Sequence, residues 1–493
     1  MRTNRFWLAL ALAAGLLAGS STAQDGPSGS SKDGKDAKKP AAPPIALVGG
    51  EIHTVTRGVI RNGTILIENG KITRVGQDIE IPEGAQRVDV TGKVITPGFV
   101  SINATNVGIR VGGGGPGGGG PPQAGSAAGR LADNLNPFDR NILFCLGSGI
   151  TTACVEVGAG PGGRFGRNGE LPDDLIDLMV ELAQTDDTQL CPCCGLAILP
   201  TEPIGPPPQA DRTARRHAVL KMSYGEMTPM LVKESPFYHL PAGSLTGALN
   251  RHQWRDQIKR ARQQLKNPPA DDGGFDVTGL GGAPGGAARR VPDEVVKLVE
   301  KKIPLRTDAL SVEQMRDMIA LAKELDYDLV LDGVHEAWMI AGELGAAKVQ
   351  TVLTPRSRRR PATGKDDRSG SSIETSAHLE KAGVPFAVAP LSASVSLDGL
   401  PGRDLTSLAL EAAFAVRGGA TEQAALAAIT IVPARMLGLA DRIGSIEEGK
   451  DADLLILDGP PLDYRTYVEK AYVGGKVYYD RGRDRIYPET SKR

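Results

Sequence analysis

Two aspartates and a histidine lie close together in the second half of the chain, each at or just after a strand-like segment. Asp308 follows the segment 302–306, Asp332 ends the segment 328–332, and His335 stands shortly after it. Carboxylates and imidazoles are the side chains that most often transfer protons in catalysis or bind a divalent cation such as zinc. These three residues are therefore the candidate catalytic residues.

The five cysteines suggest a second kind of chemistry. Cys191 and Cys194 have the C-x-x-C spacing of a disulfide, of half a metal site or of a redox pair. An oxidising compartment would favour the disulfide, in which case at least one of Cys191, Cys193 and Cys194 is oxidised. Cys154 lies inside an apolar strand-like segment, so we expect a buried free thiol there.

The candidate catalytic residues are carried by segments that alternate between strand and helix. Ser311 and Gln314 have the spacing of a capping box, and apolar residues then recur at helical intervals up to Leu325. The order of elements predicts an α/β fold, a distorted (β/α)8 TIM-like barrel whose eighth strand is unassigned; an open doubly wound sheet is the alternative. The predicted strands are residues 99–103, 151–157, 195–199, 302–306, 328–332, 349–353 and 386–390.

Both ends of the folded part have the pattern of short strands and tight turns. Residues 45–94 contain hairpin signals such as Asn69-Gly70, and residues 438–493 have the same texture. Because a small hairpin is marginally stable alone, we expect the N- and C-terminal segments to form one composite β-sandwich. The barrel would then occupy residues 95–437. Gly-rich insertions interrupt it at residues 112–125, 158–169 and 271–290.

The first residues have the layout of a secretory signal peptide. Arginines precede an apolar run and small residues follow it, so we expect residues 1–23 to be removed and residues 24–44 to form a disordered tether. A retained membrane anchor is the alternative, but a spanning helix needs roughly 20 apolar residues and this run is shorter. We expect an exported protein, periplasmic or secreted, with no membrane span in the mature chain.

The charge balance argues against a nucleic-acid partner. Lys and Arg number 57 and Asp and Glu number 58, so no excess of positive charge is available to attract phosphates. A hydrophobic share of 40% is sufficient for a buried core. The expected partner is a small-molecule ligand, and the sequence leaves a homo-oligomer open.

Two segments carry a resemblance to a known family. The run VITPGFV at residues 94–100 and the run AALAAITIVPARMLGLADRIGSIEEGKDADLLILDG at residues 424–459 resemble the amidohydrolase superfamily, in particular the branch with imidazolonepropionase and prolidase-like enzymes. The segment between them is only loosely similar. The resemblance implies a distorted TIM-like barrel with a composite β-sandwich, and metal-dependent hydrolysis of non-peptide C–N bonds.

The resemblance also implies where metal ligands should stand. The family has His-x-His at the end of its first barrel strand, where this chain has Asn103 and Thr105. Asp308 and Gly333 stand at the positions of two later ligands. Because zinc sites use Cys, His, Asp and Glu, we expect these four residues to line a ligand pocket at a degenerate metal site. The expectation is no metal and no cofactor, with a divalent metal such as zinc as the alternative.

Three functions follow from these observations. The first is a pseudoenzyme, an exported amidohydrolase-like protein that binds a small ligand or partner without metal-dependent turnover. The second is an active hydrolase that cleaves an amide, lactam or cyclic imide through a rearranged site at Asp308, Asp332 and His335. The third is a structural or scaffold protein.

Overall fold

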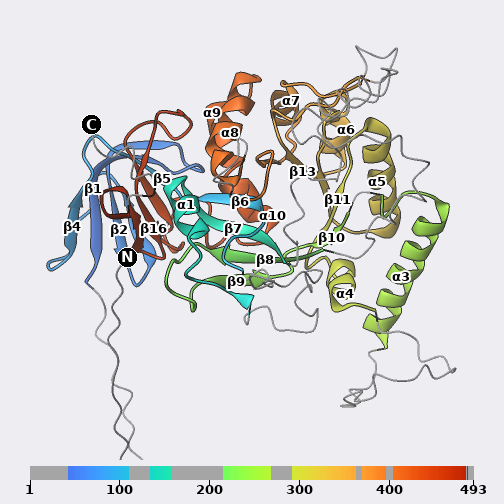
Figure 1. Cartoon of the computed structure of the whole chain (residues 1–493), viewed down its shortest axis with the longest axis horizontal. Coiled ribbons are helices and arrows are strands. Elements are labelled where there is room, and N and C mark those ends of the chain that lie inside the picture. The colour runs from blue at the N-terminus through green and yellow to red at the C-terminus, as the bar shows by residue number, and fades with distance from the viewer. Residues whose placement is uncertain are drawn as a thin grey trace, which may run out of the picture. The chain divides into compact units, whose positions relative to one another are not determined.

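The computed structural model describes residues 43–109, 134–157, 215–241, 243–267, 291–361, 369–395, 404–484 and 486. Its largest sheet has eight strands and contains both ends of the described chain, as the blue and red strands of Figure 1 show. The order is β17-β16-β15-β5-β1-β2-β3, and β4 pairs with β1. The strands are β1 Ile45–His53, β2 Val59–Glu68, β3 Lys71–Gly76, β4 Gln86–Asp89, β5 Val94–Pro97, β15 Leu454–Leu457, β16 Val468–Val473 and β17 Lys476–Asp480.

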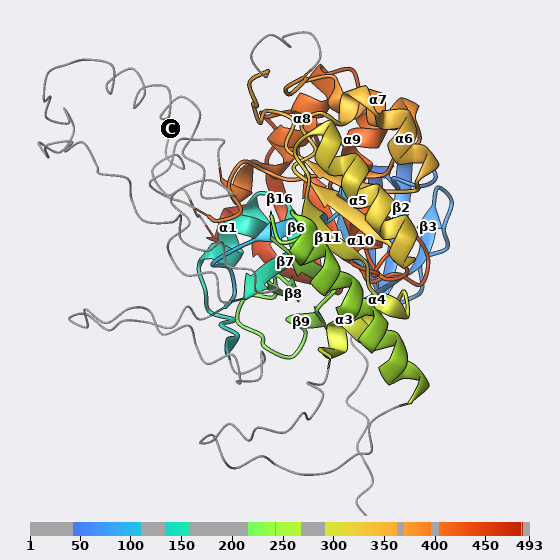
Figure 2. The ribbon, with the colours of Figure 1, turned by 90° about the vertical axis from the view of Figure 1, so that its right-hand side faces the viewer.

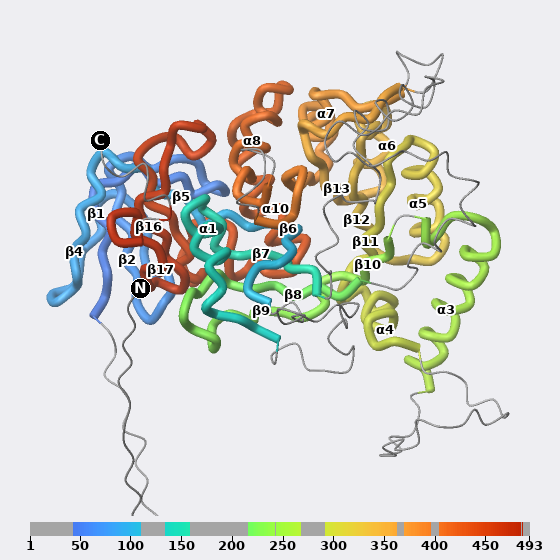
Figure 3. Tube along the Cα trace, in the orientation of Figure 1, coloured from blue at the N-terminus to red at the C-terminus, as the bar shows by residue number. Residues whose placement is uncertain are grey.

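The two ends of the chain meet where β5 pairs with β15. The pairing is antiparallel, with Leu454 opposite Pro97 and Leu457 opposite Val94. All four side chains of β15 are buried, and the red trace of β16 and β17 runs beside the blue strands in Figure 3. The predicted pairing of the N- and C-terminal segments is therefore present as one sheet, and a second layer that would make it a sandwich stays a prediction.

A buried ionic cluster connects this sheet to a central strand. The Lys221 ammonium lies 2.8 Å from Asp451 Oδ2 and 3.1 Å from Asp453 Oδ1, and Arg442 donates to Asp451 at 2.8 Å. Burial is the main cause that raises the pKa of Asp453, and the charge of Lys221 opposes it. A buried carboxylate needs such a partner, so the cluster ties the two parts together.

The central strands form two further sheets. Five parallel strands have the order β10-β11-β12-β13-β14. The other sheet is β6-β7-β8-β9, in which β6 and β7 are parallel and the later pairs antiparallel. Isolated bridges join the two sheets, Arg215 beside β8 with His239 at one side and Thr105 beside β6 with Ser394 at the other. The strands are β6 Phe99–Ala104, β7 Ile150–Val157, β8 Arg216–Lys221, β9 Leu231–Glu234, β10 Tyr238–Leu240, β11 Leu305–Asp308, β12 Leu329–Asp332, β13 Gln350–Leu353 and β14 Phe386–Val388.

Helices cover the outer side of the five-stranded sheet, as Figure 2 shows for α5, α6 and α7. In the described part, no helix is long and apolar enough to cross a membrane. The α-helices are α1 Asn141–Gly147, α3 Ala248–Lys266, α4 Asp293–Val299, α5 Val312–Leu325, α6 Ala341–Ala346, α7 Thr375–Lys381, α8 Leu408–Arg417, α9 Glu422–Ala427, α10 Ile431–Met436 and α11 Arg481–Asp484. The short 3-10 helices are Ala337–Met339 and Leu405–Ser407.

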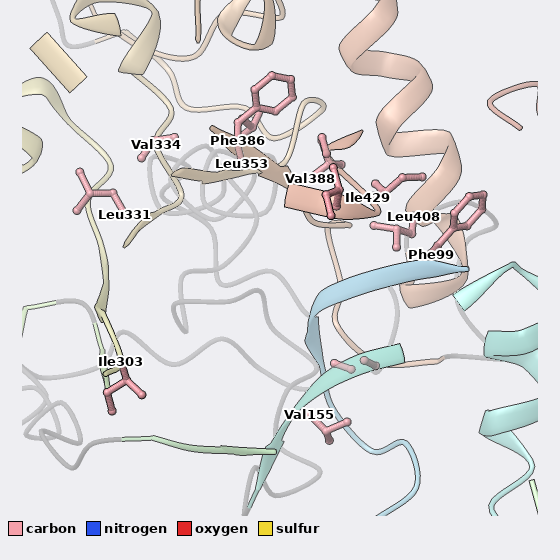
Figure 4. Packing of buried hydrophobic residues seen from close by; sticks show 14 of the residues in the cluster. Phe99, Val155, Ile303, Leu331, Val334, Leu353, Phe386, Val388, Leu408 and Ile429 are labelled. Atoms are coloured by element: carbon pink, nitrogen blue, oxygen red, sulfur yellow. The ribbon is translucent and has the colours of Figure 1, made fainter. Parts of the chain in front are cut away.

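The central strands divide their side chains between two buried clusters. Leu331, Leu353 and Val388, from three neighbouring strands, belong to the cluster that contains apolar residues of α5, α7 and α8 (Figure 4). The residue before each of them belongs to a second cluster. Successive strand residues point to opposite faces, so the second cluster marks the inner face of these strands. Its strand and strand-edge members are Val100, Ile102, Cys154, Val219, Phe237, Val330, Val352, Ala387 and Ala389.

The α/β class predicted from the sequence is confirmed. The described strands pair into three sheets, however, rather than into one closed barrel. The strand expected at 302–306 is Leu305–Asp308, and the capping box of Ser311 and Gln314 is present. Three central strands, β8, β9 and β10, were not predicted, because β8 begins among arginines and β9 and β10 are only four and three residues long. The strand expected at 195–199 lies outside the described residues.

Ending the chain at Gly449 should prevent cooperative folding. β5 would lose one of its two partner strands. Each buried apolar side chain of β15 contributes roughly 1.5–3 kcal/mol, against a total stability of about 5–15 kcal/mol. We expect aggregation or loss of a cooperative thermal transition in calorimetry. A chain that ends after Ile486 keeps β15, β16 and β17 and is the control. Equal melting of the two chains would contradict the observed pairing.

The carboxyl group of Glu447 should make the folding stability of the protein depend on pH in the acid range. Hydrogen bonding by Ser445 is the main cause that lowers the pKa of Glu447 to about 2, with Thr56 and Lys450 adding to it. Because the folded pKa lies below the ordinary value of 4.5, this stabilisation is present above about pH 4.5 and disappears as the pH falls towards 2. The urea midpoint of Glu447→Gln should therefore approach that of the native protein as the pH falls. The exposed neighbour Glu448, replaced by Gln, is the control, and a difference independent of pH would refute the assignment.

Candidate functional site

Arg306 is the centre of the polar side chains on the inner face. It belongs to β11 and is fully buried, and its register partner on the neighbouring strand β10 is His239. A strand places residues two apart on the same face, so Arg306 and Asp308 share the inner side of β11. Asp308 in turn pairs in register with Asp332 of β12.

The Arg306 guanidinium is held by side chains and backbone from two other strands. It donates from Nε to Asp332 Oδ2 at 3.0 Å, and one terminal nitrogen also contacts this carboxylate. The terminal nitrogen Nη1 donates to the Ile102 carbonyl at 3.1 Å. The other terminal nitrogen, Nη2, donates to Asn103 Oδ1 at 2.5 Å. The guanidinium carbon lies 4.8 Å from the centre of the Phe237 ring. These bonds use four of the five N–H donors of the guanidinium, so its charge is closely compensated.

Asn103 is oriented by this contact. Its Oδ1 accepts from Arg306, which identifies the other terminal atom as the amide nitrogen. Nδ2 is buried and has no hydrogen-bond partner among the described residues. An unsatisfied buried donor is unusual, so this amide is a candidate group for binding an acceptor atom of a ligand.

Two histidines lie next to Arg306 on the same face. His217 of β8 and His239 of β10 are both buried, and His217 Nε2 lies 2.8 Å from His239 Nδ1. The rings are stacked, with centres 5.0 Å apart, and Phe237 lies between them and Arg306, 4.7 Å from the His217 ring. We call Asn103, His217, His239, Arg306 and Asp332 the interior polar cluster.

The predicted catalytic residues are only partly brought together. Asp308 and Asp332 are neighbours in register, as expected. His335 instead extends to the loop after β13, where its Nε2 lies 2.8 Å from Ser357 Oγ. Arg306 is the contact of Asp332 that the prediction omitted, although its position two residues before Asp308 is a signal that it shares that face.

The predicted ligand pocket is also altered. Asn103 belongs to the interior polar cluster, whereas Thr105 pairs with Ser394 in an isolated bridge. Gly333 has φ of +66°, and a Cβ there would lie 2.8 Å from Leu310 Cδ2, so glycine serves the turn after β12. His217 is buried although it follows two arginines, and it was not among the predicted site residues. No alternation of buried and exposed residues marks β8, because every residue of the strand after Arg216 is buried.

The thiols of the two buried cysteines have low reactivity. Burial raises the pKa of the Cys154 thiol to about 12, although the charge of Arg306 opposes the shift. Cys145 and Cys154 are free thiols, so the prediction for Cys154 is confirmed. Cys191, Cys193 and Cys194 lie outside the described residues.

The described residues at the expected ligand positions do not fit a metal ion. Asn103 offers its oxygen to Arg306, and Gly333 has no side chain. Among the residues that the structure describes, no three His, Cys, Asp or Glu side chains are grouped to hold a metal.

Comparisons with known proteins identify the family. Residues 367–479 match the model of the Amidohydrolase family. An imidazolonepropionase from Clostridium tetani is 27% identical over 39% of this chain and 51% of its own length. A solved amidohydrolase from Thermotoga maritima is 25% identical, with a TM-score of 0.60 over 89% of this chain and 100% of that one. The chain spans about half the length of the Clostridium relative, and 7% and 16% of the next two curated relatives.

The prediction of no cofactor is contradicted by these comparisons. The amidohydrolases of the matched family and the imidazolonepropionases similar to this chain are typically metal-dependent. The family model, the imidazolonepropionase relatives and the Thermotoga structure together support the assignment of the chain to the amidohydrolase superfamily.

Proposed function

We propose that the chain is a hydrolase of a small-molecule amide, lactam or cyclic imide, and that the interior polar cluster is its reaction site. The observation that carries the proposal is the buried contact of 2.8 Å between His217 and His239. Neutral imidazoles accept and donate protons near physiological pH, and a buried pair is costly to retain without a role. The relatives named imidazolonepropionase suggest the substrate class.

The proposal includes a barrel in which the cluster lies at the strand ends. The second apolar cluster contains residues of β6, β7, β8, β12, β13 and β14, and Phe237 next to β10, while β11 contributes Arg306. Isolated bridges at Arg215–His239 and Thr105–Ser394 connect the four-stranded sheet with the five-stranded sheet at two places. Both observations support a distorted (β/α)8 barrel. In this architecture catalytic groups lie at the carboxyl ends of the parallel strands.

The histidine pair would move the proton. Hydrolysis of an amide requires a base that takes a proton from water as it attacks the carbonyl carbon, and an acid that delivers a proton to the departing nitrogen. Two imidazoles 2.8 Å apart can hold one extra proton between them, since a second would place like charges in contact. The same proton can thus be taken in the first half of the reaction and returned in the second.

Asn103 would bind the carbonyl, and Arg306 would hold Asn103 in place. The Asn103 amide nitrogen is a buried donor without a partner among the described residues, and Arg306 holds the amide in that orientation. A preorganised donor of this kind stabilises negative charge on a carbonyl oxygen in the transition state. Arg306 is therefore a positioning residue, and Asp332 fixes it in turn.

A second candidate function is the binding of such a compound without hydrolysis. It is favoured by the compensated charge of Arg306, which has four hydrogen bonds and no exposed surface. The first-strand positions that hold histidines in the family are Asn103 and Thr105 here. Turnover distinguishes this function from the first.

Replacing His239 or His217 with Gln should lower kcat on a panel of amides, lactams and cyclic imides. We expect a decrease of about 100-fold or more, the usual contribution of a proton-transferring group, with KM little changed. His252, which is exposed, replaced by Gln is the matched control. Turnover by the native protein that is equal in all three variants would refute the role of the pair. Saturable binding of a panel member without any turnover would support the second function.

Arg306→Met should destabilise the protein and abolish ligand binding. Asp332 would lose its buried cationic partner, which typically costs about 3–5 kcal/mol. The double variant Arg306→Met with Asp332→Leu should recover part of this loss, because no buried charge remains. Urea denaturation measures the stability, and ligand-induced thermal shift measures the binding. A single variant as stable as the native protein would show that the pair is not closely coupled.

A further inference from the structure

Ser357 and His335 meet outside the interior polar cluster. They lie in the loops after β13 and β12, neighbouring parallel strands whose ends are in register at Val352 and Asp332. His335 Nε2 and Ser357 Oγ are 2.8 Å apart, and both side chains are half-buried. A serine and a histidine at this distance have the arrangement of an activated nucleophile and its base.

We propose that Ser357 is a nucleophile activated by His335, and that the pair transfers acyl groups from small esters bearing an anionic group. The site is independent of the proposed amide hydrolysis, which uses His217 and His239. It requires no cofactor. Its substrate must reach a hydroxyl in a loop at the strand ends, where this architecture carries its chemistry.

Both loops are held in place by local contacts. His335 N donates to the Gly333 carbonyl at 2.7 Å, in the turn that Gly333 permits, and Ser357 N donates to the Thr354 carbonyl at 2.9 Å. Glu336, next to His335, accepts from Val312 N at 3.0 Å and from Gly370 N at 2.9 Å. These bonds limit the positions of the two side chains. A nucleophile and its base gain from such preorganisation.

The chemistry balances without another reactant. Ser357 Oγ attacks the ester carbonyl carbon and forms an O–C bond while its proton passes to His335 Nε2. The bond from the carbonyl carbon to the leaving oxygen then breaks, and that oxygen takes the proton. Water repeats the sequence on the acyl-serine, giving the carboxylic acid and free Ser357.

The loop that carries Ser357 determines the charge of the substrate. Arg356 is paired with the buried Glu411 at 2.6 Å, and Arg359 lies 3.7 Å from Glu336. Arg358 and Arg360 are exposed beside Ser357. Arg356 and Arg359 thus face glutamates, and the exposed guanidinium of Arg358 adds positive charge beside Ser357. An ester with a carboxylate or phosphate group fits this surface.

A phosphonofluoridate probe tests the nucleophile in the full chain. Attack by Ser357 Oγ forms an O–P bond and expels fluoride, so intact mass should increase by one phosphonyl group and peptide mapping should place it on Ser357. His335→Ala should slow labelling by about 100-fold or more. His378→Ala and Ser371→Ala are matched controls, since His378 is exposed and Ser371 belongs to the same loop region, where its Oγ accepts from Arg359 N at 3.0 Å. Absence of label on Ser357 in the folded native protein would overturn the proposal.

A second measurement separates activation from mere contact. In Ser357→Cys the new thiol should react with iodoacetamide faster when His335 is present than in the double variant with His335→Asn. Asn keeps a hydrogen bond but cannot accept the proton. Equal rates would overturn the proposal. The mono-p-nitrophenyl ester of a dicarboxylic acid should have a lower KM than a neutral p-nitrophenyl ester, and Arg358→Ala should remove the difference. None of these results depends on His217 or His239, so failure of the amide assay leaves them interpretable.

Discussion

The buried contact between Arg306 and Asp332 is the constraint on which the inner face of the central strands depends. A fully buried guanidinium is tolerated only when its charge and nearly all its donors are satisfied, and here Asp332, Ile102 and Asn103 satisfy them. The contact brings β6, β11 and β12 together around one ion pair. It also orients the Asn103 amide, so structure and proposed chemistry rest on the same group.

The eight-stranded sheet is constrained by a different buried ion cluster. Lys221, on a central strand, contacts Asp451 and Asp453 just before β15, and Glu447 connects the same segment to Thr56. The two ends of the chain are therefore joined by strand pairing and by charge. The loops of the central strands remain free to carry side chains such as His335 and Ser357 that do not support the core.

Much of the fold was predictable because it depends on local patterns. Alternation of strand and helix, the capping box at Ser311 and the paired ends all follow from residues close in sequence or from the need to bury apolar faces. The candidate site was harder to predict from the sequence. Asp308 and Asp332 were found because both end apolar strands, whereas His217 was missed because it follows two arginines and its strand has no alternating burial pattern. His335 was assigned to the wrong partner, since a loop has no period that fixes its direction.

By itself the sequence determined the α/β class, because the class depends on periods of two and of 3.6 residues, and it carried the family resemblance in two short runs. Only the tertiary structure decided which side chains meet. Arg306 and Asn103 are 203 positions apart, and His217 and His239 belong to strands joined by a single bridge. Strand register and the order of strands in the sheets set such contacts. Both are properties of the whole packed chain, because each depends on which faces are buried together.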